Sequence, residues 1–147
     1  MSRIRGKDTT PEKVVRSLLH RLGYRFRLHR KIPISQLPVR RSLGVGGSTP
    51  RFITPDIVLV RQRVAIFVHG CFWHRHDRCK YAYTPKSRVS FWKRKFEQNV
   101  ARDKVVKREL RKLGWKVVVV WQCQAERPDR LLRRLGKMLP VPEPMRR

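Results

Sequence analysis

The stretch VAIFVHGCFWHRHDRC, residues 64–79, decides how this chain is organised. Its apolar, β-branched start predicts a buried strand over 64–68. The remainder, HGCFWHRHDRC, holds two of the three cysteines and three of the five histidines in the chain. Thiolates and imidazoles at such short spacing are the ligands of tetrahedral zinc sites. A strand that runs straight into a metal-binding loop is therefore the first prediction.

Cys71, Cys79 and the distant Cys123 are the three thiols available to that loop. The fourth ligand is His76 or His74, and spacing alone does not separate the two histidines. An odd number of cysteines, two of them beside histidines, favours metal ligation in a reducing compartment over disulfide bonding. We therefore expect a zinc ion and a cytoplasmic location.

The charge balance is strongly basic, with 37 Lys and Arg against 10 Asp and Glu, a formal net charge of +27. Self-repulsion of this size indicates that an anionic partner normally neutralises the surface, and nucleic acid is the leading candidate. A solvated basic surface and a basic membrane-binding face are the alternatives. No stretch reaches the roughly 18 consecutive apolar residues of a spanning helix, and no signal-peptide pattern opens the chain.

We expect one α/β domain over 10–139, with a basic arm at 1–9 and a Pro-rich tail at 140–147. Thr10 is the expected cap of a first helix, with Pro11 and Glu12 in its first turn and Gly23 at its end. Further helices are expected at 90–113 and 128–139. From 31 to 54 the periodicity is lost, and three prolines with a GVGGS run predict a long loop insertion.

The strand pattern completes the fold class. Residues 24–28 alternate apolar and basic side chains, and apolar runs at 53–60 and 64–68 predict two antiparallel strands. The WKVVVVW run at 115–121 is the most apolar strand and is expected at the centre of the sheet. This order predicts a mixed sheet with helices on both faces.

Two acids stand in unusual places. Asp56 heads an apolar strand, and Asp103 lies near the centre of the apolar face of the second helix. Pairing of the strands would bring Asp56 near His69. Hydrolysis of a phosphodiester needs a metal, a carboxylate that holds it and an acid or base that works near neutral pH. The candidates are Asp56, His69, His74 and Asp103, with Glu12 further out; a buried salt bridge for Asp103 and a helix-dipole role for Glu12 are the structural alternatives.

Three aromatic residues accompany the metal loop: Phe72, Trp73 and, near the start of the second helix, Trp92. Ordinary core packing usually explains aromatics at helical spacing. A Phe-Trp pair within a polar metal loop suits that explanation poorly, whereas apolar wedges between base steps kink and unstack a duplex.

These motifs resemble the very short patch repair DNA mismatch endonuclease family. The resemblance runs from SRIRGKDTTPE to about Leu139 and is carried by VAIFVHGCFWHRHDRC, FW at 91–92, NVARD at 99–103 and GWKVVVVWQC at 114–123. It implies a restriction-endonuclease-like fold and a Mg²⁺-dependent nick beside a thymine mispaired with guanine, the product of 5-methylcytosine deamination. Mismatch-repair proteins are implied as partners, and we expect a monomer.

The resemblance also assigns roles. Asp56 resembles the family's metal-binding aspartate, with the main-chain carbonyl of Val68 as a second Mg²⁺ contact, and His74 resembles its catalytic histidine. The remaining matches are His69 and Asp103 in the active site, Glu12 as support for the histidine, Cys71, His76, Cys79 and Cys123 as zinc ligands, and Phe72, Trp73 and Trp92 as the aromatics that enter the duplex. Phe67-Val68-His69 stands where related nucleases have Glu-x-Lys.

Three departures from the family pattern stand out. The sequence opens at SRIRGKDT, so an extra DNA-holding arm is expected to be absent. The 31–54 insertion replaces a short turn before Asp56, and two residues, not one, separate His76 from Cys79. A zinc-containing DNA-binding protein with impaired catalysis and a basic RNA-binding protein are therefore the alternative functions.

Overall fold

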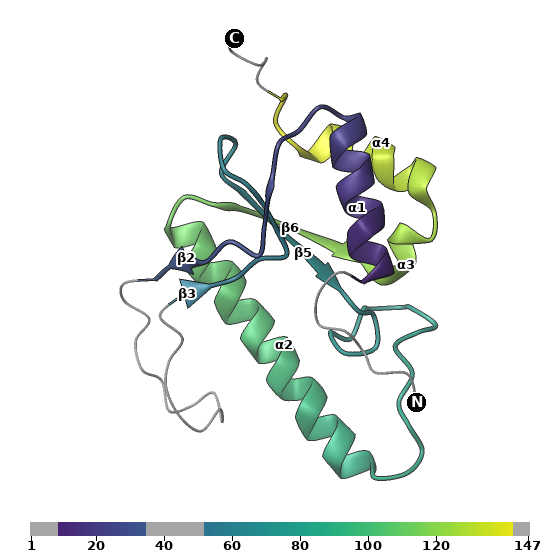
Figure 1. Cartoon of the computed structure of the whole chain (residues 1–147). Coiled ribbons are helices and arrows are strands. Elements are labelled where there is room, and N and C mark those ends of the chain that lie inside the picture. The colour runs from purple at the N-terminus through teal and green to yellow at the C-terminus, as the bar shows by residue number, and fades with distance from the viewer. Residues whose placement is uncertain (1–8, 35–51, 143–147) are drawn as a thin grey trace.

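The computed structural model describes residues 9–34 and 52–142. The expected arm, apart from Thr9, most of the 31–54 insertion and the end of the Pro-rich tail lie outside the described residues. A four-stranded mixed sheet is flanked by the long helix α2 (Val89–Lys112) on one side and by α1 (Thr10–Arg21), α3 (Gln122–Ala125) and α4 (Pro128–Met138) on the other (Figure 1). This arrangement confirms the predicted mixed α/β class.

The sheet has the strand order β1-β4-β5-β6. Its members are β1 (Arg27–Leu28), β4 (Ile57–Leu59), β5 (Val64–His69) and β6 (Lys116–Trp121). The predicted antiparallel pair is confirmed, since β4 and β5 pair with Ile57 opposite Ile66. The β5–β6 pair is parallel and runs over six residue pairs, from Val64 opposite Lys116 to His69 opposite Trp121.

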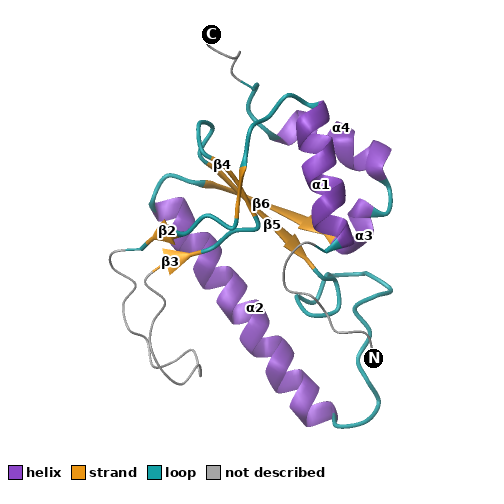
Figure 2. Ribbon diagram, in the orientation of Figure 1, coloured by secondary structure: helices purple, strands orange, loops and turns teal. Residues whose placement is uncertain are grey.

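The WKVVVVW strand was expected in the middle of the sheet, and this prediction was wrong. Among the described strands β6 lies at one edge, next to β5 only (Figure 2). Its apolar sequence reflects coverage of both faces: Val118 and Val120 belong to one hydrophobic cluster and Val117 packs against the other. Burial of the faces, not position in the sheet, determines this composition.

Alternation along β4 and β5 divides the core into two clusters. Ile57, Leu59, Val64 and Ile66 face α1 and α4, whereas Val58 and Ala65 face α2. The side-chain period of a strand is two, so each face of the sheet obtains its own apolar layer. The two layers fix the sheet between helices whose apolar sides the sequence predicted.

The first helix, α1 (Thr10–Arg21), begins one residue earlier than expected. Thr9, not Thr10, is the N-cap, and its side-chain oxygen accepts a hydrogen bond from the Glu12 amide at 3.4 Å. The backbone of Thr9 is extended, as a cap residue requires. Gly23 follows the helix with φ +86°, the left-handed conformation expected at such an end.

The expected loop at 31–54 is ordered at both of its ends. There β2 (Ile32–Pro33) pairs antiparallel with β3 (Phe52–Ile53), so a two-stranded ribbon closes the base of the insertion. Ile32, Ile34 and Ile53 are buried in the α2-side cluster. The strand predicted over 24–28 is shorter than expected, because only Arg27 and Leu28 pair and Leu28 is 41% exposed.

The remaining helices are α2 (Val89–Lys112), α3 (Gln122–Ala125) and α4 (Pro128–Met138). The predicted helices at 90–113 and 128–139 are confirmed to within a residue. Phe96 and Leu110 of α2 are buried, and Gly114 ends this helix with φ +87°. Within the described residues, no helix combines the length and apolarity needed to cross a membrane.

Candidate metal centres and active site

Three cysteines and one histidine converge beyond the C-terminal ends of the parallel strands β5 and β6. One ligand atom from each of Cys71, His76, Cys79 and Cys123 lies within 4.8 Å of the others. The Cys123 sulfur is 3.4 Å from Nδ1 of His76. Ligands at 2.0–2.3 Å from a tetrahedral zinc are roughly 3.3–3.8 Å apart, so this set fits zinc without large movement. Of the two histidines that spacing could not separate, His76 is the one that lies in this cluster.

The chemistry of the donors also fits a cation. Burial, the largest cause, raises the pKa of the Cys71 thiol to about 12. A buried thiolate needs a neighbouring positive charge, which a coordinated metal supplies. Cys123 belongs to the short helix α3, directly after β6, so the site would link the metal loop to the end of that strand.

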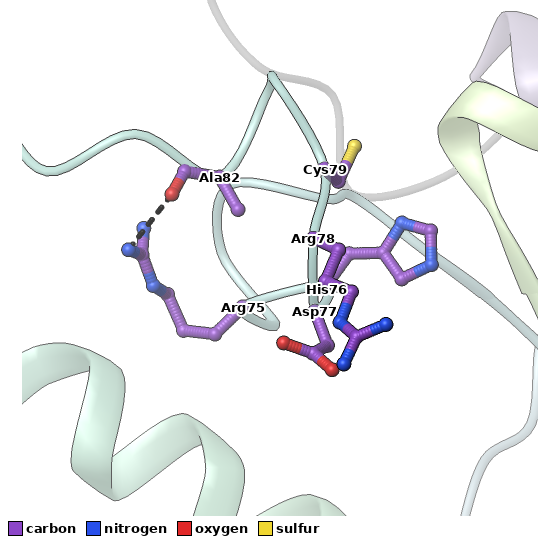
Figure 3. Close-up of a pocket in the computed structure, with 6 residues that line it drawn as sticks. All are labelled: Arg75, His76, Asp77, Arg78, Cys79 and Ala82. Carbon is purple, nitrogen blue, oxygen red and sulfur yellow. Dashed lines mark hydrogen bonds between the residues drawn. The ribbon is translucent and has the colours of Figure 1, made fainter.

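The metal loop is held by its own side chains and by α2. The Arg75 guanidinium donates to the carbonyl oxygens of Ala82 and Tyr83, both at 2.9 Å, and lies 4.0 Å from the centre of the Phe96 ring. Figure 3 shows the Arg75 side chain extending to Ala82, away from the side chains of His76 and Cys79; all four residues line a pocket of about 370 Å³. Asn99 of α2 donates to the Trp73 carbonyl oxygen at 3.1 Å. These bonds attach the loop to the helix that carries Asp103.

A second group of side chains lies on the other side of the loop. Nδ1 of His74 is 2.7 Å from a carboxylate oxygen of Asp103. The rings of His69 and His74 stack at 3.8 Å with an angle of 8° between their planes. The distances would allow His69, His74 and Asp103 to hold an ion together. However, the lone pairs of two imidazoles lie in their ring planes, and the planes of these two stacked rings are nearly parallel, so the lone pairs do not converge on one ion. The direct hydrogen bond favours a His–Asp pair over a metal site.

His69 is 7% exposed at the end of β5. Burial, followed by the charges of His74 and Lys107, lowers the pKa of His69 to about 4, although Asp103 acts in the opposite direction. Its imidazole is therefore neutral near pH 7. Nδ1 of His69 is buried with no hydrogen-bond partner among the described residues. A neutral imidazole can donate a hydrogen bond through one ring nitrogen and accept one through the other.

Asp56 directly precedes β4. Because β4 and β5 are antiparallel, Asp56 lies at the same end of the sheet as the C-terminal end of β5. Its carboxylate accepts a hydrogen bond from the Val68 amide at 2.7 Å. Burial, the largest cause, raises the pKa of Asp56 to about 6, and the nearby charge of Glu12 adds to the increase. A partly buried carboxylate of this kind fits a hard cation such as Mg²⁺, which would offset the cost of its desolvation.

Glu12 is 3% exposed in the first turn of α1 and bonds Arg16 at 3.2 Å. Its charge is among those that raise the pKa of Asp56, so the two carboxylates lie near each other. The predicted contact between the Val68 carbonyl and a metal stays a prediction. What the structure adds at Val68 is the amide bond to Asp56.

The three predicted aromatics form one cluster. The Phe72 ring lies 5.1 Å from Trp73, 5.5 Å from Trp92 and 5.1 Å from Phe96. Phe72, Trp73 and Trp92 are all partly exposed, so both the packing role and a contact with DNA are open to them. Phe91 and Tyr83 extend the cluster towards solvent, with exposures of 45% and 64%.

Sequence reasoning did not single out His29, Arg75 or Asn99. Arg75 and Asn99 hold the loop, and neither role has a sequence signal, because both depend on how the loop meets α2. His29 follows β1 and donates its backbone N–H to the Asp56 carbonyl oxygen at 3.2 Å. A histidine at the end of a basic strand was the available signal.

A mixed sheet with a Cys₃His cluster beside a carboxylate and a His–Asp pair defines a candidate metal-dependent hydrolase. The family model described as DNA mismatch endonuclease Vsr matches residues 1–36 and 49–80. This chain belongs to that family. The gap between the two matched segments, residues 37–48, falls within the insertion predicted at 31–54.

Individual relatives support the assignment. The chain is 46% identical over 139 residues to the type II nicking enzyme V.XorIIP of Xanthomonas oryzae, covering 95% of this chain and 88% of the relative. It is 35% identical to the type II nicking enzyme V.NmeAIP of Neisseria meningitidis, with 95% and 86% covered. It is 36% identical over 131 residues to the DNA mismatch endonuclease Vsr of Escherichia coli, with 89% and 72% covered.

Proposed function

We propose that this protein is an endonuclease that nicks one strand of duplex DNA beside a T:G mismatch, with Mg²⁺ held at Asp56. The observation that carries the proposal is the 2.7 Å His74–Asp103 hydrogen bond at the same end of the sheet as the partly buried Asp56 carboxylate. Relatives named as nicking enzymes and as a mismatch endonuclease support the same activity. A restriction-endonuclease-like fold is part of the proposal.

His74 is the proposed general base. With Asp103 accepting from Nδ1, the lone pair of the imidazole is at Nε2, which is then free to take a proton from an attacking water. The water oxygen bonds to phosphorus, the bond from phosphorus to the leaving oxygen breaks, and that oxygen takes up a proton. The carboxylate of Asp103 stabilises the imidazolium that forms.

Asp56 and His69 act on the phosphate. A cation bound at Asp56 supplies neutralisation of the phosphate charge. The Val68 amide holds one carboxylate oxygen of Asp56, which restricts the carboxylate to one orientation. His69, neutral and stacked on His74, donates a hydrogen bond to a phosphate oxygen without changing its own charge. Glu12 supports the site from α1.

The Cys71, His76, Cys79 and Cys123 cluster holds a structural zinc in this proposal, and Phe72, Trp73 and Trp92 enter the duplex near the mismatch. Insertion of aromatic rings unstacks a base step, which is least costly where pairing is already imperfect. A basic surface with 37 Lys and Arg supplies the phosphate contacts. Mismatch-repair proteins as partners, a monomeric state and a cytoplasmic location complete the proposal.

The test uses a duplex with one T:G mismatch, a different label on each strand, and a matched T:A duplex. With Mg²⁺ we expect a nick in one strand of the mismatched duplex only, and none from Asp56→Ala. Equal nicking by Asp56→Ala would contradict the proposed site. Equal nicking of the T:A duplex would contradict the proposed mismatch specificity.

A further inference from the structure

His29 lies opposite Asp56 across the first strand pair of the sheet. The β1–β4 register pairs Arg27 with Val58 and Leu28 with Ile57, so its next step pairs His29 with Asp56. The His29 amide donates to the Asp56 carbonyl oxygen at 3.2 Å, which continues the ladder by that step. Directly opposite residues of an antiparallel pair have Cβ atoms about 4.5–5.5 Å apart.

Two features of His29 carry an energetic cost. Its backbone has φ +50°, a left-handed conformation that histidine adopts far less readily than glycine. Its Nε2 atom is buried and has no hydrogen-bond partner among the described residues. A left-handed backbone at a residue other than glycine and a buried polar atom without a partner are both unfavourable. Both persist at one residue, next to the carboxylate that heads β4.

Turn geometry alone does not account for this residue. Glycine or asparagine at position 29 would end β1 in the same conformation at lower cost, and neither would bury an unpartnered ring nitrogen. His29 also lies near the carboxylate, since it is among the groups that lower the pKa of Asp56 against the dominant effect of burial. The side chain and the backbone of His29 therefore both lie close to Asp56.

We propose that His29 is the second side chain of the cation site headed by Asp56, and that its Nε2 binds a water molecule of the cation's hydration shell. Mg²⁺ prefers oxygen ligands and keeps several of its waters, so an imidazole serves it best through such a water. His29 is thus a positioning residue for the hydrated cation. The inference rests on the proposed function in one respect, the binding of a divalent cation at Asp56.

The test measures Mn²⁺ binding to the zinc-loaded protein by electron paramagnetic resonance, without DNA, with zinc content checked in each sample. His29→Gly removes the ring and relieves the left-handed strain, whereas His29→Gln retains a polar group near the position of Nε2. His20→Ala is the histidine control, because His20 is exposed on α1 and its ring contacts Phe26 at a tilted angle, 4.7 Å between ring centres. Asp56→Asn reports whether the cation site is at Asp56.

We expect His29→Gly to weaken Mn²⁺ binding about tenfold while its melting temperature stays equal or rises. His29→Gln is expected to remain within about threefold of the wild type in affinity, despite a less favourable backbone. Mn²⁺ affinity unchanged in His29→Gly but abolished in Asp56→Asn would overturn the role of His29 and leave the proposed function intact. Equal affinity in the wild type and Asp56→Asn would overturn the cation site itself.

Discussion

The two donor clusters differ in how the chain assembles them. Three of the four sulfur and imidazole donors lie within residues 71–79, and Cys123 joins them from α3. Asp56, His74 and Asp103 instead come from the start of β4, the metal loop and the middle of α2. The first cluster is local and sulfur-rich, whereas the second depends on the sheet and on one helix crossing. The short spacing of ligands in the sequence is enough to indicate the first cluster, whereas the residues of the second cluster come together only when the chain folds.

The clusters are nevertheless interleaved in one loop. Cys71, His76 and Cys79 turn towards one side, while His69 and His74 stack on the other. The ring of His76 in turn stacks on Trp121 at 4.2 Å, at the end of β6. Loss of the sulfur cluster should therefore disturb the reaction site, whereas damage to the reaction site should leave the sulfur cluster intact.

Cys123→Ser tests the first half of that asymmetry and has the largest expected effect. Removal of the ligand that links the loop to α3 should release zinc and lower the free energy of unfolding by more than about 4 kcal/mol. Elemental analysis and urea unfolding provide the measurement. Full zinc content with unchanged stability would remove Cys123 from the site.

Asp56→Asn tests the second half. The shape of the side chain is kept and its charge is lost, so Mg²⁺ binding fails and nicking should fall by at least about 10³-fold, equivalent to about 4 kcal/mol. Zinc content and melting temperature should match the wild type. A variant that also lost its zinc would show that the two clusters are not separable.

Asp103→Asn should have a smaller effect on nicking, a decrease of about 10²-fold to 10³-fold. The amide still reaches Nδ1 of His74 but no longer fixes its proton there or stabilises the imidazolium. Single-turnover nicking rates at saturating Mg²⁺ give the comparison. Asp129, in the first turn of α4, offers a matched control, and Asp129→Asn should leave the rate unchanged.

The smallest expected effect is on the pH dependence of the free energy of unfolding, and it involves His69. Its pKa of about 4 lies below the usual 6.5, so the folded protein binds fewer protons than the unfolded chain between these values. The stabilisation is present above pH 6.5 and is lost as pH falls towards 4. A nearby zinc cation would act in the same direction.

His69→Gln should therefore lose less stability than the wild type between pH 7 and pH 5, by about 1–2 kcal/mol. Urea unfolding at the two pH values is the measurement, with the zinc content held equal. An identical loss of stability in both proteins would mean that His69 is charged in the folded state.

The sequence predicts helices and strands well wherever the periodicity of apolar residues agrees with the residues that end these elements. Gly23 and Gly114 end helices as expected, and the 53–60 and 64–68 runs give the antiparallel pair β4–β5. The apolar run 115–121 misled because a strand covered on both faces has the same composition at an edge as at the centre. The ribbon of β2 and β3 was missed because each strand is two residues long.

In the candidate site, too, the sequence predicts what is local and misses what depends on contacts between distant residues. Spacing predicted the sulfur donors but could not choose between His74 and His76, because both can reach a tetrahedral position. Which of the two histidines joins the sulfur cluster depends on Asp103, because this residue bonds His74. Asp103 is 29 residues from His74 in the sequence and meets it only after α2 packs on the sheet. His29 was missed because its link to Asp56 is a register property of the β1–β4 pair.

The most direct test of two separate metal sites follows zinc content and nicking in the same samples during mild chelation with EDTA and re-addition of metal. We predict that nicking of the T:G duplex disappears while about one zinc per chain remains, and that Mg²⁺ alone restores it. Activity that disappears only as zinc is lost, and that returns with Zn²⁺ but not with Mg²⁺, would contradict the account.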